Sequence, residues 1–515
     1  MKLADLISGL DHPNVQGSLD CEVTGLAYDS RAIAPGLFFV AIRGLQQDGH
    51  QFIGQAIAKG ATAVLVEDQW PLKGIDEIPQ RQPCIIRVRD SRKALSALAS
   101  QFYGRPSHRL GMIGVTGTNG KTTSTTLIKR VLEAAGKKVG LLGTVGYHVG
   151  QEVLRASHTT PESLDLQRLL AQMVQAGMEY AVMEVSSHAL ALERVADCAF
   201  DAAVFTNLSQ DHLDFHADME EYFRAKLKLF STLGAGNPKS LPRMAVVNGD
   251  DPRVSEVIAS VRTPYWTYSI TKEADLSAEN VRLDFEGTRF LAVTPEGKFE
   301  VQSELVGRYN ISNILAAIGV ALSQGIPIEL IQKGIHEAPQ VPGRFEKIHE
   351  GQEFVVIVDY AHTDEALRQL LLAVRELIRV AARPGGRILT VFGCGGDRDR
   401  GKRPKMGQVA AQLSDFVILT SDNPRTEDPI SIIREIETGI KQSVSSSLRS
   451  SGYLVIPDRI EAIEKAIGLA HPGDIVVIAG KGHEDYQIIG GRKLPFDDRE
   501  MARKALRGLK AKGES

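Results

Sequence analysis

Short apolar runs alternate with helical patterns along most of this chain, and that alternation constrains the fold more than any other feature. The runs lie at residues 36–41, 61–66, 112–116, 181–185, 202–205, 245–247, 354–359, 388–392, 416–420 and 474–479. Between the later runs the apolar residues recur at helical spacing, as in 122–135. Strands that are apolar on both faces belong to parallel sheets covered by helices. We therefore expect an α/β protein whose ligands bind at the carboxyl ends of its parallel strands.

Two interruptions of this alternation divide the 515 residues into three predicted domains. A turn signal at 104–106 follows an apolar helical pattern, and two prolines and a glycine interrupt the chain at 338–343. The expected domains are residues 1–105, 106–341 and 342–515, and each is long enough to bury a core of its own. The strand-like runs before residue 105 are short, which predicts a smaller α/β domain at the N-terminal end.

The composition excludes several classes of protein. The 60 Lys and Arg residues nearly balance 63 Asp and Glu residues, so no bulk positive field would draw the chain to nucleic acid or to a membrane surface. Four scattered cysteines without a C-x-x-C pair argue against a disulfide scaffold or a zinc ribbon and fit a reducing compartment. Neither a secretory signal nor an apolar run of eighteen residues is readable. We expect a cytoplasmic protein.

A glycine-rich loop between the apolar run 112–116 and the helical pattern 122–135 has the context of a phosphate-binding loop. Its residues are Gly117, Thr118, Asn119, Gly120, Lys121, Thr122 and Thr123. Glycines let backbone N–H groups approach a phosphate, the lysine reaches the β and γ oxygens, and Thr122 can ligate Mg²⁺. Val115 stands where the usual P-loop pattern has its first glycine. The alternative is a glycine-rich turn with an incidental lysine.

Two further polar segments follow apolar runs. The run 181–185 carries Glu184, as a Walker B strand carries its metal-binding carboxylate, and Ser186, Ser187 and His188 come directly after it. A carboxylate at a strand end is also commonly solvated or caps a helix. The segment 206–216 follows the run 202–205 and offers His212 as a possible ligand, or is simply a polar loop.

Six motifs, in this order along the chain, resemble those of the Mur ligases of peptidoglycan synthesis. They lie at residues 117–123, 184–188, 207–212, 307–313, 342–346 and 359–362. Folylpolyglutamate synthetases share the architecture and several of these signals. The motifs at 422–425 and 480–484 narrow the resemblance to members that add diaminopimelate. The resemblance implies an N-terminal domain for the uridine nucleotide, a central P-loop ATPase-type parallel sheet and a C-terminal Rossmann-like doubly wound domain for the incoming amino acid.

The resemblance also implies the reaction. ATP would phosphorylate the D-glutamyl side-chain carboxylate of UDP-N-acetylmuramoyl-L-alanyl-D-glutamate, and the amine of meso-diaminopimelate would attack the acyl phosphate, giving an amide, ADP and phosphate. Positioning and charge neutralisation carry phosphoryl transfer, here by Lys121 and two Mg²⁺ ions. The expected partners are these small molecules alone, with no nucleic acid and no membrane, and the expected enzyme is a monomer.

By this resemblance the catalytic residues are Lys121, Glu184, His212 and Lys226, and the metal ligands are Thr122, Glu184, His212 and Lys226. From its helical pattern alone Lys226 is a solvated lysine. The resemblance instead makes it a lysine carbamylated by CO₂, which turns a cation into an anion with the oxygen ligands that Mg²⁺ prefers. Lys228 is expected to be the ordinary surface residue.

The remaining site residues also follow from the resemblance. The ATP site would comprise residues 117–123 of the loop with Asn310, Arg344 and Asp359. The UDP-sugar peptide site would comprise Ser30, Thr159, Thr160, Ser186 and Arg194. Thr159 and Thr160 before a proline could be only a turn or a helix start, and Arg344 could be only an ion pair at the domain linker.

The predicted amino-acid site is the most specific inference. Its residues are Arg398, Asp422, Asn423, Pro424, Arg425, Gly480 and Glu484. Diaminopimelate differs from lysine by an additional carboxylate, and an arginine can bind it through two parallel hydrogen bonds. Arg425 follows the run 416–420 in a proline-containing loop, where such a group is expected. The alternative is a plain β-turn, which leaves Arg425 without a role.

Two rival functions remain open from the sequence. One is a related amide ligase, such as a folylpolyglutamate synthetase or a lysine-adding muramoyl ligase. The other is a P-loop switch or binding module, which would hydrolyse nucleotide without an amino acid. The guanine-specific N-K-x-D sequence of many such switches is not found after a strand.

Overall fold

The computed structural model describes residues 1–44, 47–71, 83–236, 238–380, 386–444 and 452–513. The chain divides into two compact units, each built from stretches that are far apart in the sequence. Unit 1 comprises residues 1–114, 137–203 and 228–243, and unit 2 comprises residues 115–136, 204–227 and 244–515. The strands β6 (Gly111–Thr116) and β11 (Ala202–Phe205) and the helix α7 (Met219–Ser231) each contribute residues to both units.

Unit 1 begins with a small α/β sheet. Its described strands run in the order β1 (Asn14–Gln16), β5 (Cys84–Val88), β4 (Ala63–Glu67), β3 (Leu37–Val40) and β2 (Gly25–Ala27), and only β1 is antiparallel to its neighbour. Helices α1 (Leu3–Ile7) and α3 (Ser91–Phe102) pack on one side of the sheet, and α2 (Ile53–Ala58) packs on the other. Asp90 begins α3 by accepting hydrogen bonds from two backbone N–H groups of its first turn.

The second part of unit 1 joins parallel and antiparallel strands. β10 (Tyr180–Glu184) pairs in parallel with β7 (Val139–Leu142), and β7 continues antiparallel into β8 (Tyr147–Val149) and β9 (Glu152–Leu154). Helices α5 (Ser163–Gln175) and α6 (Ser187–Ala191) flank β10 in the sequence. β10 is buried along its whole length, which confirms the prediction of an apolar strand that ends at Glu184.

Unit 2 contains the helix that follows the glycine-rich loop, α4 (Lys121–Ala134). Gly136 comes directly after its C-cap residue with a φ of +77°, as a helix-terminating glycine should. Strands β12 (Met244–Asn248), β13 (Tyr265–Ser269) and β14 (Leu276–Asp284) are parallel, and β15 (Gly287–Thr294) and β16 (Gly297–Ser303) extend them antiparallel. α8 (Val254–Ser260), α9 (Arg308–Ser323) and α10 (Ile328–His336) complete this part.

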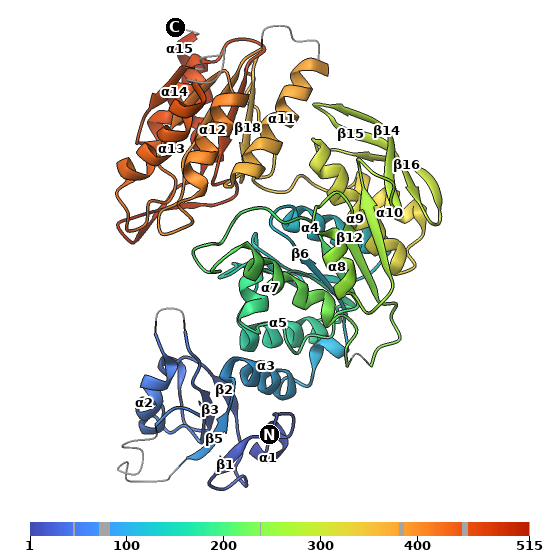
Figure 1. Cartoon of the computed structure of the whole chain (residues 1–515), viewed down its shortest axis with the longest axis vertical. Helices are drawn as coiled ribbons and strands as arrows, with labels where there is room; N and C mark the ends of the chain where they lie inside the picture. The colour runs from blue at the N-terminus through green and yellow to red at the C-terminus, as the bar shows by residue number, and fades with distance from the viewer. Residues whose placement is uncertain (45–46, 72–82, 237, 381–385, 445–451, 514–515) are drawn as a thin grey trace. The chain divides into compact units, whose positions relative to one another are not determined.

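The C-terminal part of unit 2 is a doubly wound sheet (Figure 1, orange to red). Its described strands follow the order β17 (Glu346–Ile348), β18 (Val355–Asp359), β22 (Ile475–Ala479), β19 (Ile388–Phe392), β20 (Phe416–Leu419) and β21 (Gly452–Val455). All pairs are parallel except β17 with β18. A two-stranded ribbon of β23 (Tyr486–Ile489) and β24 (Arg492–Pro495) follows β22.

Helices cover both faces of this sheet. α11 (Asp364–Val380), α12 (Lys402–Leu413) and α13 (Pro429–Val444) share one apolar core with it, and α14 (Arg459–Leu469) and α15 (Asp498–Gly513) share the other. The predicted α/β class with parallel sheets is therefore confirmed. The boundaries of the three expected domains remain a prediction. In the described residues, no helix combines the length and the apolar character needed to cross a lipid bilayer.

Candidate active site

The glycine-rich loop joins the end of β6 to the start of α4, and two of its glycines are required by close packing. Gly117 and Gly120 have φ values of +144° and +87°, which disfavour other residues. A Cβ atom on Gly117 would lie 1.8 Å from Oγ1 of Thr206, and one on Gly120 would lie 2.4 Å from Oδ1 of Asn313. The loop can keep this shape only with glycine at both positions.

The segment after β11 holds the glycine-rich loop through hydrogen bonds that involve backbone N–H groups. The N–H of Thr118 donates to the carbonyl of Asn207 over 2.8 Å, and the N–H of Asn119 donates to Oδ1 of the same residue over 2.9 Å. The N–H of Ser209 in turn donates to Oγ1 of Thr118 over 3.0 Å. Asn207 therefore shapes the loop, although the sequence offered it only as part of a motif and not as a site residue.

The cationic and hydroxyl side chains of the loop are held by hydrogen bonds. Lys121 donates from Nζ to the carbonyl oxygens of Gly117 and Thr118, each over 2.8 Å. Arg344 donates from Nη2 to Oγ1 of Thr122 over 3.3 Å, although the two residues are far apart in the chain. The structure thus brings Arg344 to the loop, while its predicted contact with the nucleotide stays a prediction.

Asn310 and Asn313 form a buried amide chain on α9. Asn310 donates from Nδ2 to the carbonyl of Val306 over 2.8 Å, and Asn313 donates to Oδ1 of Asn310 over 3.0 Å. Oδ1 of Asn313 also accepts from the hydroxyl of Ser124 over 3.3 Å. Sequence reasoning selected Asn310 but missed Asn313, the residue that packs against Gly120.

Lys226 on α7 is buried, with an exposed fraction of 1%. Its ammonium donates to the carbonyl of Gly117 over 2.9 Å and lies 4.2 Å above the ring of Tyr222. Burial, together with the charge of Lys121, holds the pKa of Lys226 well below its usual value. The solvated lysine that the helical pattern alone predicts is therefore wrong. Lys228, two residues on, is exposed, as expected of a surface residue, and donates to the carbonyl of Leu190 over 3.2 Å.

His212 lies beside a buried carboxylate. Its backbone N–H donates to Oδ1 of Asp211 over 2.9 Å, and its Nε2 lies 3.5 Å from Oδ2. Lys402 and His362 each lie 3.6 Å from the same carboxylate. Burial would raise the pKa of Asp211, but the positive charge of Lys402 and the two histidines hold it well below its usual value. Asp211 is a residue that the sequence analysis did not select.

In unit 1, Glu184 ends β10 among hydroxyl groups. Its carboxylate accepts from the N–H of Thr144 over 2.8 Å and from the Thr144 hydroxyl over 3.1 Å, and that hydroxyl lies 3.1 Å from Oγ1 of Thr159. Thr160 donates from Oγ1 to the carbonyl of Glu184 over 2.8 Å, and Oγ1 also accepts from the N–H of Ser186 over 3.0 Å. The structure therefore brings Thr159, Thr160, Ser186 and Glu184 together, and Thr144 is an addition that the sequence did not reveal.

Arg194 joins the same cluster from the segment after α6. It donates from Nη1 to the carbonyl of Thr160 over 3.0 Å, and its Nε lies 3.3 Å from Glu162. Ser30, also in unit 1, lies in the short 3₁₀ helix Ser30–Ala32. It is buried and donates to Oε1 of Gln55 over 2.9 Å.

Asp359 ends β18 with both oxygens engaged by the backbone. Oδ2 accepts from the N–H of Phe345 over 2.7 Å, and Oδ1 accepts from the N–H of Ala361 over 2.8 Å. Burial raises the pKa of Asp359, and the charge of Arg344 opposes that rise. The guanidinium of Arg344 lies 4.6 Å from the ring centre of Tyr360. Asp359 thus fixes the backbone directly after Arg344, while its predicted contact with ribose stays a prediction.

The predicted amino-acid site gathers at the carboxyl ends of β20 and β22. Asn423 donates from Nδ2 to Oε2 of Glu484 over 2.8 Å, and its Oδ1 accepts from Nζ of Lys481 over 3.2 Å. Gly480, with a φ of +116°, packs against Asp422, since a Cβ atom there would lie 2.5 Å from Oδ2. The structure thus brings these predicted residues together and adds the fully buried Lys481, which the sequence analysis did not select.

Arg425 and Arg398 flank Gly395 in the neighbouring loop. A Cβ atom on Gly395 would lie 2.8 Å from Nη1 of Arg425 and 3.7 Å from Cγ of Arg398. Arg425 donates from Nη1 to the carbonyl of Gly396 over 2.7 Å. Burial lowers the pKa of Arg425, and the charge of Arg398 lowers it further. Two neighbouring guanidinium groups that repel each other would both be stabilised by a bound anion.

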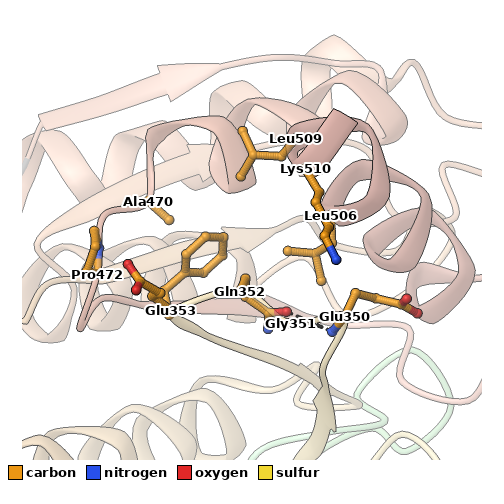
Figure 2. Close-up of a pocket in the computed structure, with 10 residues that line it drawn as sticks. Glu350, Gly351, Gln352, Glu353, Ala470, Pro472, Leu506, Leu509 and Lys510 are labelled. Atoms are coloured by element: carbon orange, nitrogen blue, oxygen red, sulfur yellow. Dashed lines mark hydrogen bonds between the residues drawn. The ribbon is translucent and has the colours of Figure 1, made fainter. Parts of the chain in front are cut away.

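A pocket in the described residues lies elsewhere. It has a volume of about 320 Å³ and is lined by Glu350, Gln352 and Glu353 before β18, by Ala470 and Pro472 before β22, and by Leu506, Leu509 and Lys510 of α15 (Figure 2). Its lining residues stand at the amino ends of β18 and β22. Because ligands of parallel sheets bind at the carboxyl ends, this pocket is not the predicted site.

Comparison with known proteins agrees with the motif order. Three family models match in turn: "Mur ligase family, catalytic domain" at residues 22–103, "Mur ligase middle domain" at 115–321 and "Mur ligase, glutamate ligase domain" at 343–482. The chain belongs to the Mur ligase family. This confirms the predicted family and its ligase class, and it argues against a P-loop switch or a binding module.

Two curated Mur ligases show how far the similarity extends. The UDP-N-acetylmuramoyl-L-alanyl-D-glutamate–2,6-diaminopimelate ligase of Syntrophomonas wolfei is 46% identical to this chain, and that of Solibacter usitatus is 47% identical. In each comparison 99% of both chains is covered. A solved structure titled as the same ligase is 34% identical, with a TM-score of 0.64 over 95% of each chain. MurF ligase from Thermotoga maritima in complex with ADP is 19% identical, with a TM-score of 0.62 over 94% of this chain and 98% of that one, and shows the shared fold alone.

Proposed function

We propose that this Mur ligase is an ATP-dependent enzyme that joins meso-2,6-diaminopimelate to the D-glutamate of UDP-N-acetylmuramoyl-L-alanyl-D-glutamate. It releases ADP and phosphate, and acts as a cytoplasmic monomer in peptidoglycan precursor synthesis. The observation that carries the proposal is the pair Arg398 and Arg425 around Gly395, which suits a second carboxylate on the incoming amine. The full-length relatives with 46% and 47% identity are named for this reaction.

The three proposed domains share out the ligands. Residues 1–105 bind the uridine nucleotide through Ser30, and residues 106–341 bind ATP and the muramoyl peptide. Residues 342–515 bind the amino acid and also supply Arg344 and Asp359 to the nucleotide. The muramoyl peptide contacts Thr159, Thr160, Ser186 and Arg194, which unit 1 already holds in one hydrogen-bonded cluster.

The first chemical step needs charge neutralisation more than covalent chemistry. The backbone N–H groups of residues 117–123 and the N-terminus of α4 surround the β and γ phosphates, and Lys121 and Arg344 oppose the charge that develops there. The D-glutamyl carboxylate attacks the γ phosphorus, ADP leaves, and an acyl phosphate remains. The neutral amine of diaminopimelate then attacks the acyl carbon, phosphate leaves with the bond electrons, and the nitrogen gives up a proton as the amide forms.

Most of the predicted metal ligands supply the oxygen atoms that Mg²⁺ prefers. Among the described residues no three His, Cys, Asp or Glu side chains gather into one ready-made metal site, as is usual for Mg²⁺, which takes one or two carboxylates along with substrate phosphates. Thr122, Glu184, His212 and the carbamate of Lys226 would hold two Mg²⁺ ions, which would neutralise phosphate charge when bound. Burial and the lowered pKa of Lys226 support the carbamate, because only the neutral amine can attack CO₂.

The amine site selects its substrate by charge. Arg425 and Arg398 bind the distal carboxylate of diaminopimelate, while Asp422 and Glu484 bind its ammonium end and Asn423 fixes the geometry of Glu484. Pro424 and Gly480 shape the loops that carry these groups. Lysine lacks the distal carboxylate, so the guanidinium of Arg425, which donates to the carbonyl of Gly396, would be left without that anion.

A phosphate-release assay tests the proposal. The enzyme with ATP and UDP-muramoyl dipeptide should release phosphate rapidly with meso-diaminopimelate, slowly with L-lysine and hardly at all without an amine, and mass spectrometry should show the tripeptide. Arg425→Ala should lose addition of diaminopimelate while ATP binding persists. Equal use of lysine, or phosphate release without any amine, would contradict the proposal.

A further inference from the structure

Arg403, in the first turn of α12, is fully buried. Its hydrogen bonds go to residues other than those proposed to bind the substrate. Its guanidinium donates to both carboxylate oxygens of Glu427, over 2.9 Å and 2.8 Å, and to Glu435 over 2.9 Å. It also donates to the carbonyl of Gly395 over 3.2 Å. Arg403 therefore joins the loop that bears Arg425 to the loop that bears Arg398.

Glu427 continues this link on its other side. Its Oε1 accepts from the backbone N–H of Asp397 over 2.6 Å, so one carboxylate receives both the buried guanidinium and the neighbouring loop. Thr426 adds a hydrogen bond of 2.7 Å from its hydroxyl to Oδ1 of Asp397, and the N–H of Gly396 donates to the carbonyl of Asn423 over 2.9 Å. The loops 395–397 and 423–427 are thus joined along their length.

Close packing makes this junction determine where Arg425 lies. A Cβ atom on Gly396 would lie 1.9 Å from the carbonyl oxygen of Pro424, so the two loops are already in contact. Arg425 completes the contact by donating from Nη1 to the carbonyl of Gly396 over 2.7 Å. A change in the spacing of the loops would therefore move the guanidinium of Arg425 relative to that of Arg398.

We propose that Arg403 and Glu427 are positioning residues for amine selection: they hold the two loops at the spacing at which Arg398 and Arg425 receive the same distal carboxylate. This inference rests on the proposed function, because it assigns that carboxylate to the two arginines. A purely structural role is the alternative, since buried ion pairs that are broken also cost stability. Nε of Arg403 is buried and has no hydrogen-bond partner among the described residues, so the pair is not optimal for stability alone.

The test uses two variants that disturb the junction by different means. Glu427→Gln keeps the size of the side chain but puts an N–H₂ group where Arg403 or Asp397 donates. Gly395→Ala leaves the ion pair intact and places a methyl group 2.8 Å from Nη1 of Arg425. Matched controls in the same domain are Glu437→Gln, on the helix α13 that follows the loop of Glu427, and Gly468→Ala, where a Cβ atom would meet nothing within 4 Å.

The full-length enzyme is assayed for kcat and KM with ATP, with meso-diaminopimelate and with L-lysine. For both junction variants, we expect KM for diaminopimelate to rise about tenfold or more, while KM for ATP changes less than about twofold. The ratio of kcat/KM for diaminopimelate over lysine should fall by a similar factor. The melting temperature of Gly395→Ala should match that of Gly468→Ala.

Each other result has a defined meaning. If KM values for ATP and diaminopimelate rise together, or if kcat alone falls, the pair is structural and the inference is wrong. If the selectivity ratio of Gly395→Ala equals that of the wild type, the inference is also wrong. If the wild-type enzyme itself shows no preference for diaminopimelate, the proposed function fails first, and the wild-type measurement alone reveals that.

Discussion

A buried ion pair between Arg459 and Asp498 stabilises the strand ends that carry the proposed amine site. Replacing one of the two residues should destabilise that region strongly. Both side chains are fully buried, and Arg459 donates to the carboxylate from Nε and from Nη2, each over 2.7 Å. The same guanidinium donates to the carbonyl of Ser421 over 3.3 Å and to that of Ala479 over 2.9 Å. It therefore pins the carboxyl ends of β20 and β22, directly before Asp422 and Gly480.

The magnitude follows from what Asp498→Ala leaves behind. Arg459 would keep its charge in a fully buried place with two carbonyl acceptors and no carboxylate, and a buried pair broken in this way costs about 3–5 kcal/mol. One factor of ten in an equilibrium corresponds to about 1.4 kcal/mol, so the opening of this region should become roughly 150- to 5,000-fold more populated. The comparison variant is Glu350→Gln. It breaks the exposed ion pair between Glu350 and Arg507, which lies on α15 like Asp498, and should cost less than about 1 kcal/mol.

Hydrogen exchange followed by mass spectrometry is the suitable assay. The two tryptophans, Trp70 and Trp266, lie outside residues 342–515, so tryptophan fluorescence would not report on this region. Backbone amides of β20 and β22 should exchange faster in Asp498→Ala by the factor above, while those of β3 and β4 should not change. Equal exchange in Asp498→Ala and Glu350→Gln would refute the claim that this pair holds the strand ends.

A double variant separates the charge from the volume. Arg459→Met combined with Asp498→Leu removes both charges and keeps apolar volume, and such replacements of buried pairs are often neutral or stabilising. Exchange in β22 should therefore return to within about tenfold of the wild-type rate. If the double variant is as unstable as Asp498→Ala, the cost comes from lost packing and not from an uncompensated charge.

Two further predictions concern titratable groups. Lys226→Ala should lower kcat about 100-fold or more, and formate or acetate should partly restore activity, because their carboxylate replaces the carbamate. The control variant Lys228→Ala should change kcat little. Absence of rescue together with a bare ammonium in a crystal structure would count against the carbamate. Burial, with the charge of Arg344, lowers the pKa of His483 to about 4 from its usual value near 6.5. His483 therefore stays neutral in the folded chain while the unfolded chain takes up a proton, so the free energy of unfolding should fall by about 3 kcal/mol as the pH falls from 6.5 to 4. Urea titrations at several pH values should show this slope for the wild type and a flatter one for His483→Asn; equal slopes would contradict it.

The strands and the phosphate-binding loop could be predicted from the sequence because their signals are local. The runs at 112–116, 181–185 and 388–392 match β6, β10 and β19 to within one residue. Apolar runs of that length, bounded by glycines and polar residues, allow few other structures in an alternating chain. Gly117 and Gly120 were also readable, because only glycine accepts both the positive φ and the close packing of that loop.

The burial of Lys226 could not be predicted, because it depends on contacts that the helical pattern does not contain. A lysine two residues before Lys228 on an amphipathic helix looks solvated, yet one is buried under the glycine loop and the other is half-exposed. The difference comes from Tyr222 and the carbonyl of Gly117, which lies 109 residues earlier in the chain. Asp211 was missed for the same reason, since its partners Lys402 and His362 lie far along the chain.

The hydrogen-bond partners of the buried Arg and Lys side chains differ between the proposed binding sites and the rest of the fold. Arg403 donates three hydrogen bonds to carboxylates and Arg459 donates two, so their charge is balanced within the protein. Arg425 and Lys226 instead donate to backbone carbonyls, which orient a cation without cancelling its charge. A cation that is oriented but not balanced, such as Arg425, raises the local potential for a carboxylate, whereas burial lowers the pKa of Lys226 and so weakens its positive charge. A net charge near zero is therefore compatible with strongly anionic substrates, because the positive potential is built at these few positions.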